Sequence, residues 1–243
     1  MDFLSIFWPS PERQIAKARK RVKEPHGDAS VRVGAAQKLA EMGTPEALRA
    51  LLDRFQITVS PSVQDEEEKE QVLSWIVHHG EKTIPPLMQF LKTERQVYWP
   101  LRALREILSR EELISRLEDL LRYHWENPPA SPEPQAQMIR SLRDLHSRGL
   151  EEVVRLHLQE RDDDIRLASI DYLFELPEQD VREAILECYL DSDDRPRIRG
   201  HLLERLEQQR WSVRGYRPKI EETLPEEYAL TRDGQIRRIG KRF

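Results

Sequence analysis

Residues whose side chains could do chemistry are few in this chain, and their spacing matches no catalytic pattern. The single cysteine, Cys188, lies between Leu186 and Leu190, a setting more typical of a small core residue than of a nucleophile. No Gly-rich stretch is suited to cradling phosphate, and the histidines lack the close spacing of metal ligands. Six of the seven, His78, His79, His124, His146, His157 and His201, are scattered along the chain. We therefore expect no catalytic residue, no metal site and no cofactor.

Charge is spread unevenly along the 243 residues, whose net charge is −5. Residues 1–24 carry six Lys/Arg against three Asp/Glu, and residues 195–243 carry thirteen against seven. The stretch between them carries 20 against 34, so the body is acidic and its ends are basic. An acidic body argues against nucleic acid as the partner along the whole chain. One cysteine excludes an internal disulfide and fits a reducing compartment, so we expect a cytoplasmic protein.

A nine-residue unit organises the sequence. It begins with a β-branched apolar residue and Arg and closes on Leu, and its last two clear copies start 33 residues apart. A period of this size is typical of stacked helical hairpins. The clear copies are Val31–Leu39, Ile165–Leu173 and Ile198–Leu206, and weaker ones are Glu68–Ile76, Gln96–Leu104 and Pro134–Leu142.

Helix-capping residues support these units. The residue three places before a unit can cap a helix in five of the six copies: Asp28, Asp65, Thr93, Ser131 and Asp162. A second helix after each unit is predicted by the end signal Gly43 with the cap Thr44, and by a capping box of Ser109 and Glu112.

The pattern from Asp28 to Leu48, Asp-x-x-Val-Arg-x-x-Ala-Ala-x-x-Leu-x-x-x-Gly-x-Pro-Glu-Ala-Leu, resembles HEAT repeats of the phycobilisome-lyase-like kind. The resemblance covers about residues 12–209 and implies an all-α superhelix, a HEAT-like solenoid of about six repeats. It implies that the unit's Arg bonds to a carboxylate in the neighbouring turn, which concerns Arg32, Arg166 and Arg199. Lys69, Val97 and Gln135 stand at that place in the other units. Most relatives are binding scaffolds, although some HEAT-like proteins are enzymes.

The two ends of the array should differ from its repeats. Residues 1–24 form an apolar N-terminal segment with a first basic helix, and two interpretations stay open: a cap on the first repeat, or an anchor for a membrane or partner. Residues 25–209 are the repeat array, interrupted by the linkers 58–65 and 127–134. Residues 210–243 form a C-terminal cap, in which Asp233-Gly234 predicts a β-hairpin. We favour a three-residue loop that pairs Leu230 with Ile236 and leaves Gly234 left-handed.

If unit places one, five and nine face the core, places four, seven and eleven share an outer stripe. This stripe predicts a binding surface for a protein, with Trp99, Arg102 and Arg140 as anchors. Its candidate partner-binding residues are Trp99, Arg102, Glu106, Arg140, Asp144, Asp171, Glu175 and His201.

The sequence thus predicts a non-catalytic scaffold or adaptor for protein–protein interaction. The alternatives are a HEAT-like enzyme, either DNA glycosylase-like or chromophore-lyase-like, and a structural subunit of a larger complex. No segment approaches the length of a membrane span.

Overall fold

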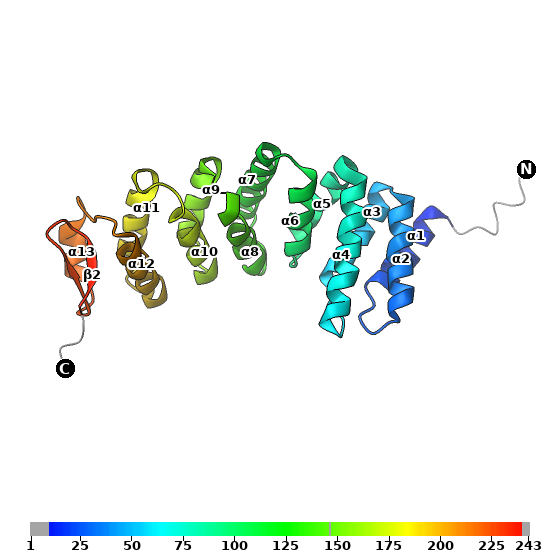
Figure 1. The fold of residues 1–243 in the computed structure, drawn as a ribbon, viewed down its shortest axis with the longest axis horizontal. Coiled ribbons are helices and arrows are strands. Elements are labelled where there is room, and N and C mark those ends of the chain that lie inside the picture. Colours follow the sequence, from blue (N-terminus) through cyan, green and yellow to red (C-terminus); the bar gives the residue numbers. More distant parts are fainter. Residues whose placement is uncertain (1–9, 146, 240–243) are drawn as a thin grey trace, which may run out of the picture. The chain divides into compact units, whose positions relative to one another are not determined.

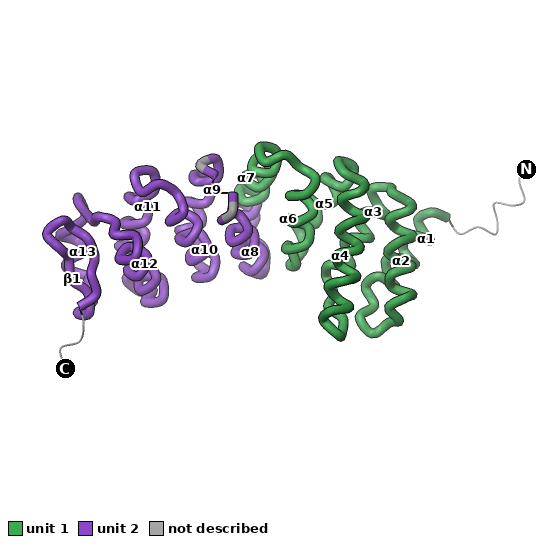
Figure 2. The backbone as a smooth tube through the Cα atoms, in the orientation of Figure 1, with its two compact units in different colours: residues 1–123 green, residues 124–243 purple. Residues whose placement is uncertain are grey.

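The structure is a computed structural model that describes residues 10–145 and 147–239. The chain forms two compact units, residues 1–123 and 124–243 (Figure 2). Each unit is built from helical hairpins stacked side by side, the architecture of an α-solenoid, and the second also carries a short antiparallel β-hairpin (Figure 1). The predicted cap or anchor at residues 1–9 lies outside the described residues.

The first unit contains two layers of helices. In one layer α4 packs between α2 and α6, and in the other α3 packs on α1 and α5. Helix α7 passes from this unit into the next. The bounds are α1 Pro11–Val22, α2 Ala29–Met42, α3 Pro45–Leu52, α4 Ser62–His79, α5 Ile84–Thr93, α6 Tyr98–Ile107 and α7 Arg110–Glu126, with 3₁₀ turns at Asp53–Gln56 and Gly80–Thr83.

The second unit repeats this arrangement. Helix α10 packs between α8 and α12, α9 and α11 pack against α10, and strand β2 packs on α12. The bounds are α8 Glu133–Ser141, α9 Glu151–Leu156, α10 Asp163–Leu173, α11 Glu178–Leu190, α12 Pro196–Gln209, α13 Arg217–Thr223, β1 Tyr228–Leu230 and β2 Ile236–Arg238, with 3₁₀ turns at Arg143–Leu145, Arg148–Leu150 and His157–Gln159.

The six nine-residue units predicted from the sequence lie on α2, α4, α6, α8, α10 and α12. The ninth residue of each unit lies at the centre of the core. That residue is 0% exposed in every unit: Leu39, Ile76, Leu104, Leu142, Leu173 and Leu206. The fifth place is also buried throughout. The first place is not buried throughout, because Val31 is 47% exposed at the rim of a groove between α1 and α2 and Gln96 is exposed as well. The prediction that place one always faces the core was wrong at these two positions.

Helix ends follow the predicted capping signals in part. Asp28 accepts the backbone N–H of Ser30, Asp162 caps α10, and Gly43 ends α2 with a left-handed φ of 57°. Ser109 and Glu112 bond reciprocally, so that capping box is confirmed.

Three predicted caps were wrong. Helix α4 begins at Ser62, so Asp65 lies inside it and the expected linker 58–65 is shorter than predicted. Thr93 is the last residue of α5, and Ser131 is not the cap residue of α8.

The C-terminal hairpin is confirmed in its register. Leu230 pairs with Ile236, and Gly234 has a φ of 79°. An added bridge between Ser212 and Gln235 ties the hairpin to the loop after α12. Helix α13 within this segment was not predicted. None of the helices in the described part of the chain is both long and apolar enough to cross a membrane.

The ninth residue of every nine-residue unit is fully buried, so replacing it by Ala should leave a cavity. We expect a loss of about 2–5 kcal/mol in the free energy of unfolding for each of Leu39→Ala, Leu173→Ala and Leu206→Ala. Val31→Ala is the matched control, since this exposed side chain should change stability by less than about 0.5 kcal/mol. Hydrogen exchange should show the loss mainly in adjacent repeats. Near-neutral leucine variants would refute the alignment of units.

Candidate functional site

Three predicted binding residues gather on α6 in the first unit. Arg102 lies 5.3 Å above the ring of Trp99, donates to Glu70 of α4 at 2.5 Å, and lies 3.5 Å from Glu106. Trp99 is only partly exposed, because it stacks on Phe55 with the ring centroids 6.0 Å apart. Trp99 therefore also has a packing role.

Tyr98 is the aromatic side chain that sequence reasoning missed. It is 63% exposed and meets Trp99 edge to face at 5.4 Å. It occupies place three of its unit, outside the stripe that the repeat alignment selects. Its position directly before Trp99 was the available signal.

Helix α4, which packs on α6, adds acidic side chains to this part of the first unit. Glu66 and Glu67 are exposed and make no ion pair with any residue that the structure describes, whereas Glu70 is held by Arg102. We call the following set the aromatic–acidic surface: Glu66, Glu67, Glu70, Tyr98, Trp99, Arg102 and Glu106. Four carboxylates against one guanidinium make this surface negative.

Three further predicted residues meet in the second unit, in a ladder of charges between α10 and α12. Asp171 accepts from His201 at 2.8 Å, and Arg205 lies 3.7 Å from Asp171 and 3.3 Å from Glu175. Arg143 donates to Glu175 at 3.2 Å. Burial raises the pKa of Asp171, but the bond from His201 and the nearby arginines outweigh burial and lower it. These side chains compensate one another and present less free charge than the sequence suggested.

Of the two remaining predicted residues, only the side chain of Arg140 can be placed, and it joins neither cluster. Arg140 is exposed on α8, and the side chain of Asp144 lies outside the described residues. Ala168 holds the fourth place of the nine-residue unit Ile165–Leu173 and is only 2% exposed. The expected outer stripe is therefore interrupted at this residue.

A buried ionic network in the first unit was also missed. Arg32 donates to both oxygens of Glu68, at 2.7 and 2.6 Å, and Arg54 donates to the same carboxylate at 2.9 Å. Asp65 joins Arg54 and Lys69 at 2.8 and 2.7 Å. All five residues are buried, with less than 10% of each residue exposed. Two of them, Asp65 and Glu68, share the acidic run that gives α4 its outer row.

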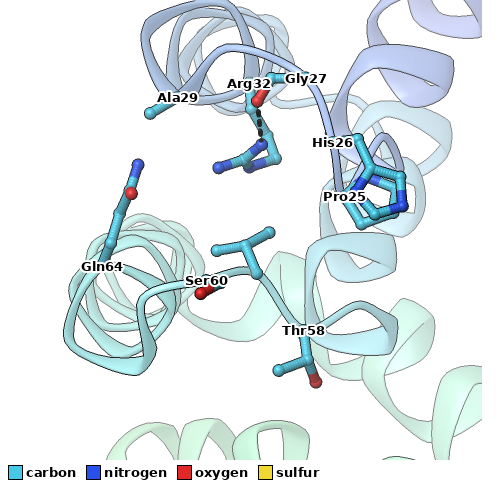
Figure 3. A pocket seen from close by; sticks show the side chains of 9 residues that line it. Pro25, His26, Gly27, Ala29, Arg32, Thr58, Ser60 and Gln64 are labelled. Carbon is cyan, nitrogen blue, oxygen red and sulfur yellow. Dashed lines mark hydrogen bonds between the residues drawn. The ribbon is translucent and has the colours of Figure 1, made fainter.

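The network supports a pocket of about 620 Å³ between the loop before α2 and the loop before α4 (Figure 3). Arg32 lies in its wall and donates to the carbonyls of Glu24 and Gly27, while Asp65 accepts the N–H of Val59. Four of the five Arg32 N–H groups are thus engaged. The network therefore holds both loops in place through hydrogen bonds. Its positive and negative side chains mostly compensate one another.

The unit Arg has different partners in different repeats. Arg199 donates at 2.7 Å to Asp193 in the turn before its helix, as the resemblance implies, whereas Arg32 bonds Glu68 within helix α4 and not a carboxylate of the neighbouring turn. Arg166 instead donates to the hydroxyl of Ser192 at 2.7 Å and lies 3.5 Å from the sulfur of Cys188. A carboxylate in the neighbouring turn is therefore not required for burying this Arg.

Two basic hollows complete the surface. One, about 460 Å³, lies between α1 and α2 beside Arg13, Lys17, Arg21 and Lys38. The other, about 570 Å³, lies in the second unit and is called the arginine pocket; it is lined by Arg182, Ser212, Arg214, Gly215, Arg217, Arg232, Asp233, Gly234 and Gln235. Among the described residues, no three or more His, Cys, Asp or Glu side chains lie close enough to hold a metal ion.

Stacked helical hairpins with a buried unit Arg define the class as an α-helical repeat protein. Residues 31–56 match the family described as PBS lyase HEAT-like repeat, and this match is consistent with a HEAT-like repeat protein. The match covers one repeat, formed by α2 and α3, and within the first unit α1 packs on both of these helices, α4 packs on α2 and α5 packs on α3. No curated protein and no solved structure matches the chain.

The buried network yields a stability prediction. Glu68→Gln should lower the free energy of unfolding by about 3–5 kcal/mol, because it leaves Arg32 and Arg54 buried without their shared carboxylate. Glu67→Gln, an exposed neighbour on the same helix, should cost less than about 0.5 kcal/mol. Denaturant unfolding measures both, and equal effects would contradict the network's role.

The same network predicts a dependence on pH. Burial raises the pKa of Glu68, but the bonds from Arg32 and Arg54 outweigh burial and lower it below 4.5. A lowered folded pKa means that this stabilisation is complete above pH 4.5 and is lost as the pH falls through the folded value. The difference in stability between wild type and Glu68→Gln should therefore shrink in acid. A constant difference would contradict an ionised Glu68.

Proposed function

We propose that this protein is a non-catalytic scaffold that binds a basic segment of a partner protein on the aromatic–acidic surface. The single observation that carries the proposal is Tyr98, an aromatic ring left 63% exposed beside a negative helix face. Large exposed aromatic side chains are common anchors of protein interfaces. The free cysteine is buried, which agrees with a cytoplasmic site of action.

The surface has the chemistry of a receptor for Lys or Arg. The face of Tyr98 offers a cation–π contact, and Trp99 already holds Arg102 in such a contact at 5.3 Å. Glu66 and Glu67 have no internal partner among the described residues, so a partner's cation meets free carboxylates. Nucleic acid is disfavoured at this surface because its phosphates would face these carboxylates.

The side chains around Tyr98 are held in place by their neighbours, and this favours the aromatic–acidic surface as a binding site. Trp99 is fixed by Phe55 and Arg102 is fixed between Glu70 and Glu106, so Tyr98 rests on groups that already hold their positions. A preorganised site loses less entropy when a partner binds.

A photo-reactive phenylalanine analogue at position 98, introduced in the native cell, should cross-link a partner protein, and mass spectrometry should find a basic segment in the adduct. The matched control is the same analogue at Val31, which is exposed on α2 outside the surface. Adducts of equal yield at both positions, or adducts with nucleic acid alone, would refute the proposal.

Binding of the cross-linked partner can then be measured directly. Tyr98→Ala should weaken it by about tenfold or more, as the loss of an interface anchor does. Glu66→Lys with Glu67→Lys should abolish it, whereas Glu111→Lys with Val31→Ala should leave it within about twofold. The partner should be recovered with unchanged mass. A modified product would favour an enzyme.

A further inference from the structure

We infer that the arginine pocket binds a phosphoryl group, carried by a small molecule or by a phosphorylated side chain. This site goes beyond the proposed scaffold function and lies wholly in the second unit. It has a volume of about 570 Å³ and is lined by four arginines against one aspartate.

The four arginines come from segments that are far apart in the sequence. Arg182 belongs to α11, Arg214 to the loop after α12, Arg217 to the start of α13 and Arg232 to the hairpin turn. The bridge between Ser212 and Gln235 brings the loop and the turn together. Gly234, with a φ of 79°, allows the turn to approach, since a Cβ there would lie 3.1 Å from the Ser212 hydroxyl.

Two of these side chains are held in place by the protein. Arg182 donates to the carbonyl of Ser212 at 3.2 Å, and Arg217 donates to that of Thr231 at 3.0 Å. These bonds to neutral carbonyls fix the guanidinium groups without cancelling their charge. Arg217 also lies 3.5 Å from Glu221, and Asp233 is part of the lining.

The other two arginines supply free donors. The side chains of Arg214 and Arg232 are exposed and make no hydrogen bond or ion pair with any residue that the structure describes. Each offers a planar fork of N–H groups that matches phosphate oxygens in pairs. Fixed and free guanidinium groups around one hollow therefore suit a compact dianion.

Isothermal titration with inorganic pyrophosphate is the first test, with acetate at equal ionic strength as the anion control. Wild type should bind pyrophosphate, and Arg214→Ala with Arg232→Ala should weaken binding by about tenfold or more. Lys219→Ala with Arg237→Ala removes the same charge from exposed positions of this segment outside the pocket and should change binding by less than about twofold.

Two further variants separate the pocket from general charge. Asp233→Asn should strengthen binding, because it removes the only carboxylate in the lining. Replacing Arg214 and Arg232 by Lys keeps the charge but loses the fork, so binding should be intermediate. Circular dichroism of each variant should match wild type.

The source of the phosphoryl group is distinguished by a second pair of probes. A phosphoserine peptide that binds more tightly than pyrophosphate, when its unphosphorylated form does not bind, indicates a modified partner; the reverse order indicates a small molecule. Equal losses in the pocket and control variants, or no binding by wild type to either probe, would overturn the site. If the pocket variant and the control variant bound single-stranded RNA equally well, binding would depend on the general positive charge of this segment and not on the pocket. None of these outcomes depends on Tyr98, so the scaffold proposal stands or falls separately.

Discussion

A helical hairpin cannot bury its own apolar face, and this constraint underlies the rest of the structure. Each unit's ninth residue must be covered by the neighbouring hairpins, and in all six units that residue is fully buried. Stability in such an array is local, so a repeat can change its other positions as long as this contact is kept. That freedom explains why Arg32 is held by Glu68, whereas Arg166 is held by a hydroxyl.

The architecture was predictable because it depends on periodic apolar residues. The ninth place aligned weak units such as Gln96–Leu104 with clear ones, and the hairpin register followed from Asp233-Gly234 and two apolar residues. The capping signals were less reliable for a physical reason. A carboxylate before an apolar run can accept a hydrogen bond from a helix N–H, as Asp28 does, or from a buried guanidinium, as Asp65 does. Sequence alone does not distinguish these two roles.

The candidate surfaces were only partly predictable, since they depend on neighbours that the repeat alignment does not specify. Trp99 and Arg102 were found through their places in the unit, but the exposed ring lies one residue earlier. Asp171, Glu175 and His201 were predicted as open positions, yet α12 brings Arg205 to the same ladder and satisfies them. The arginine pocket could not be found from spacing, because Arg182 and Arg232 are 50 residues apart and meet through a turn and a bridge.

The distribution of satisfied and unsatisfied charge separates packing from recognition in this protein. Arg54 and Glu68 are buried and paired with each other, as the cost of an unpaired buried charge requires. Glu66 and Glu67 are exposed on the same helix α4 and make no ion pair with any described residue, and the same holds for Arg214 and Arg232 in the second unit. The acidic run of α4 thus does two things: its inward carboxylates fix the repeat, and its outward carboxylates leave a negative surface beside Tyr98. Because the inward contacts hold α4 in place, the outward row is presented in a fixed position, which is what a binding surface requires.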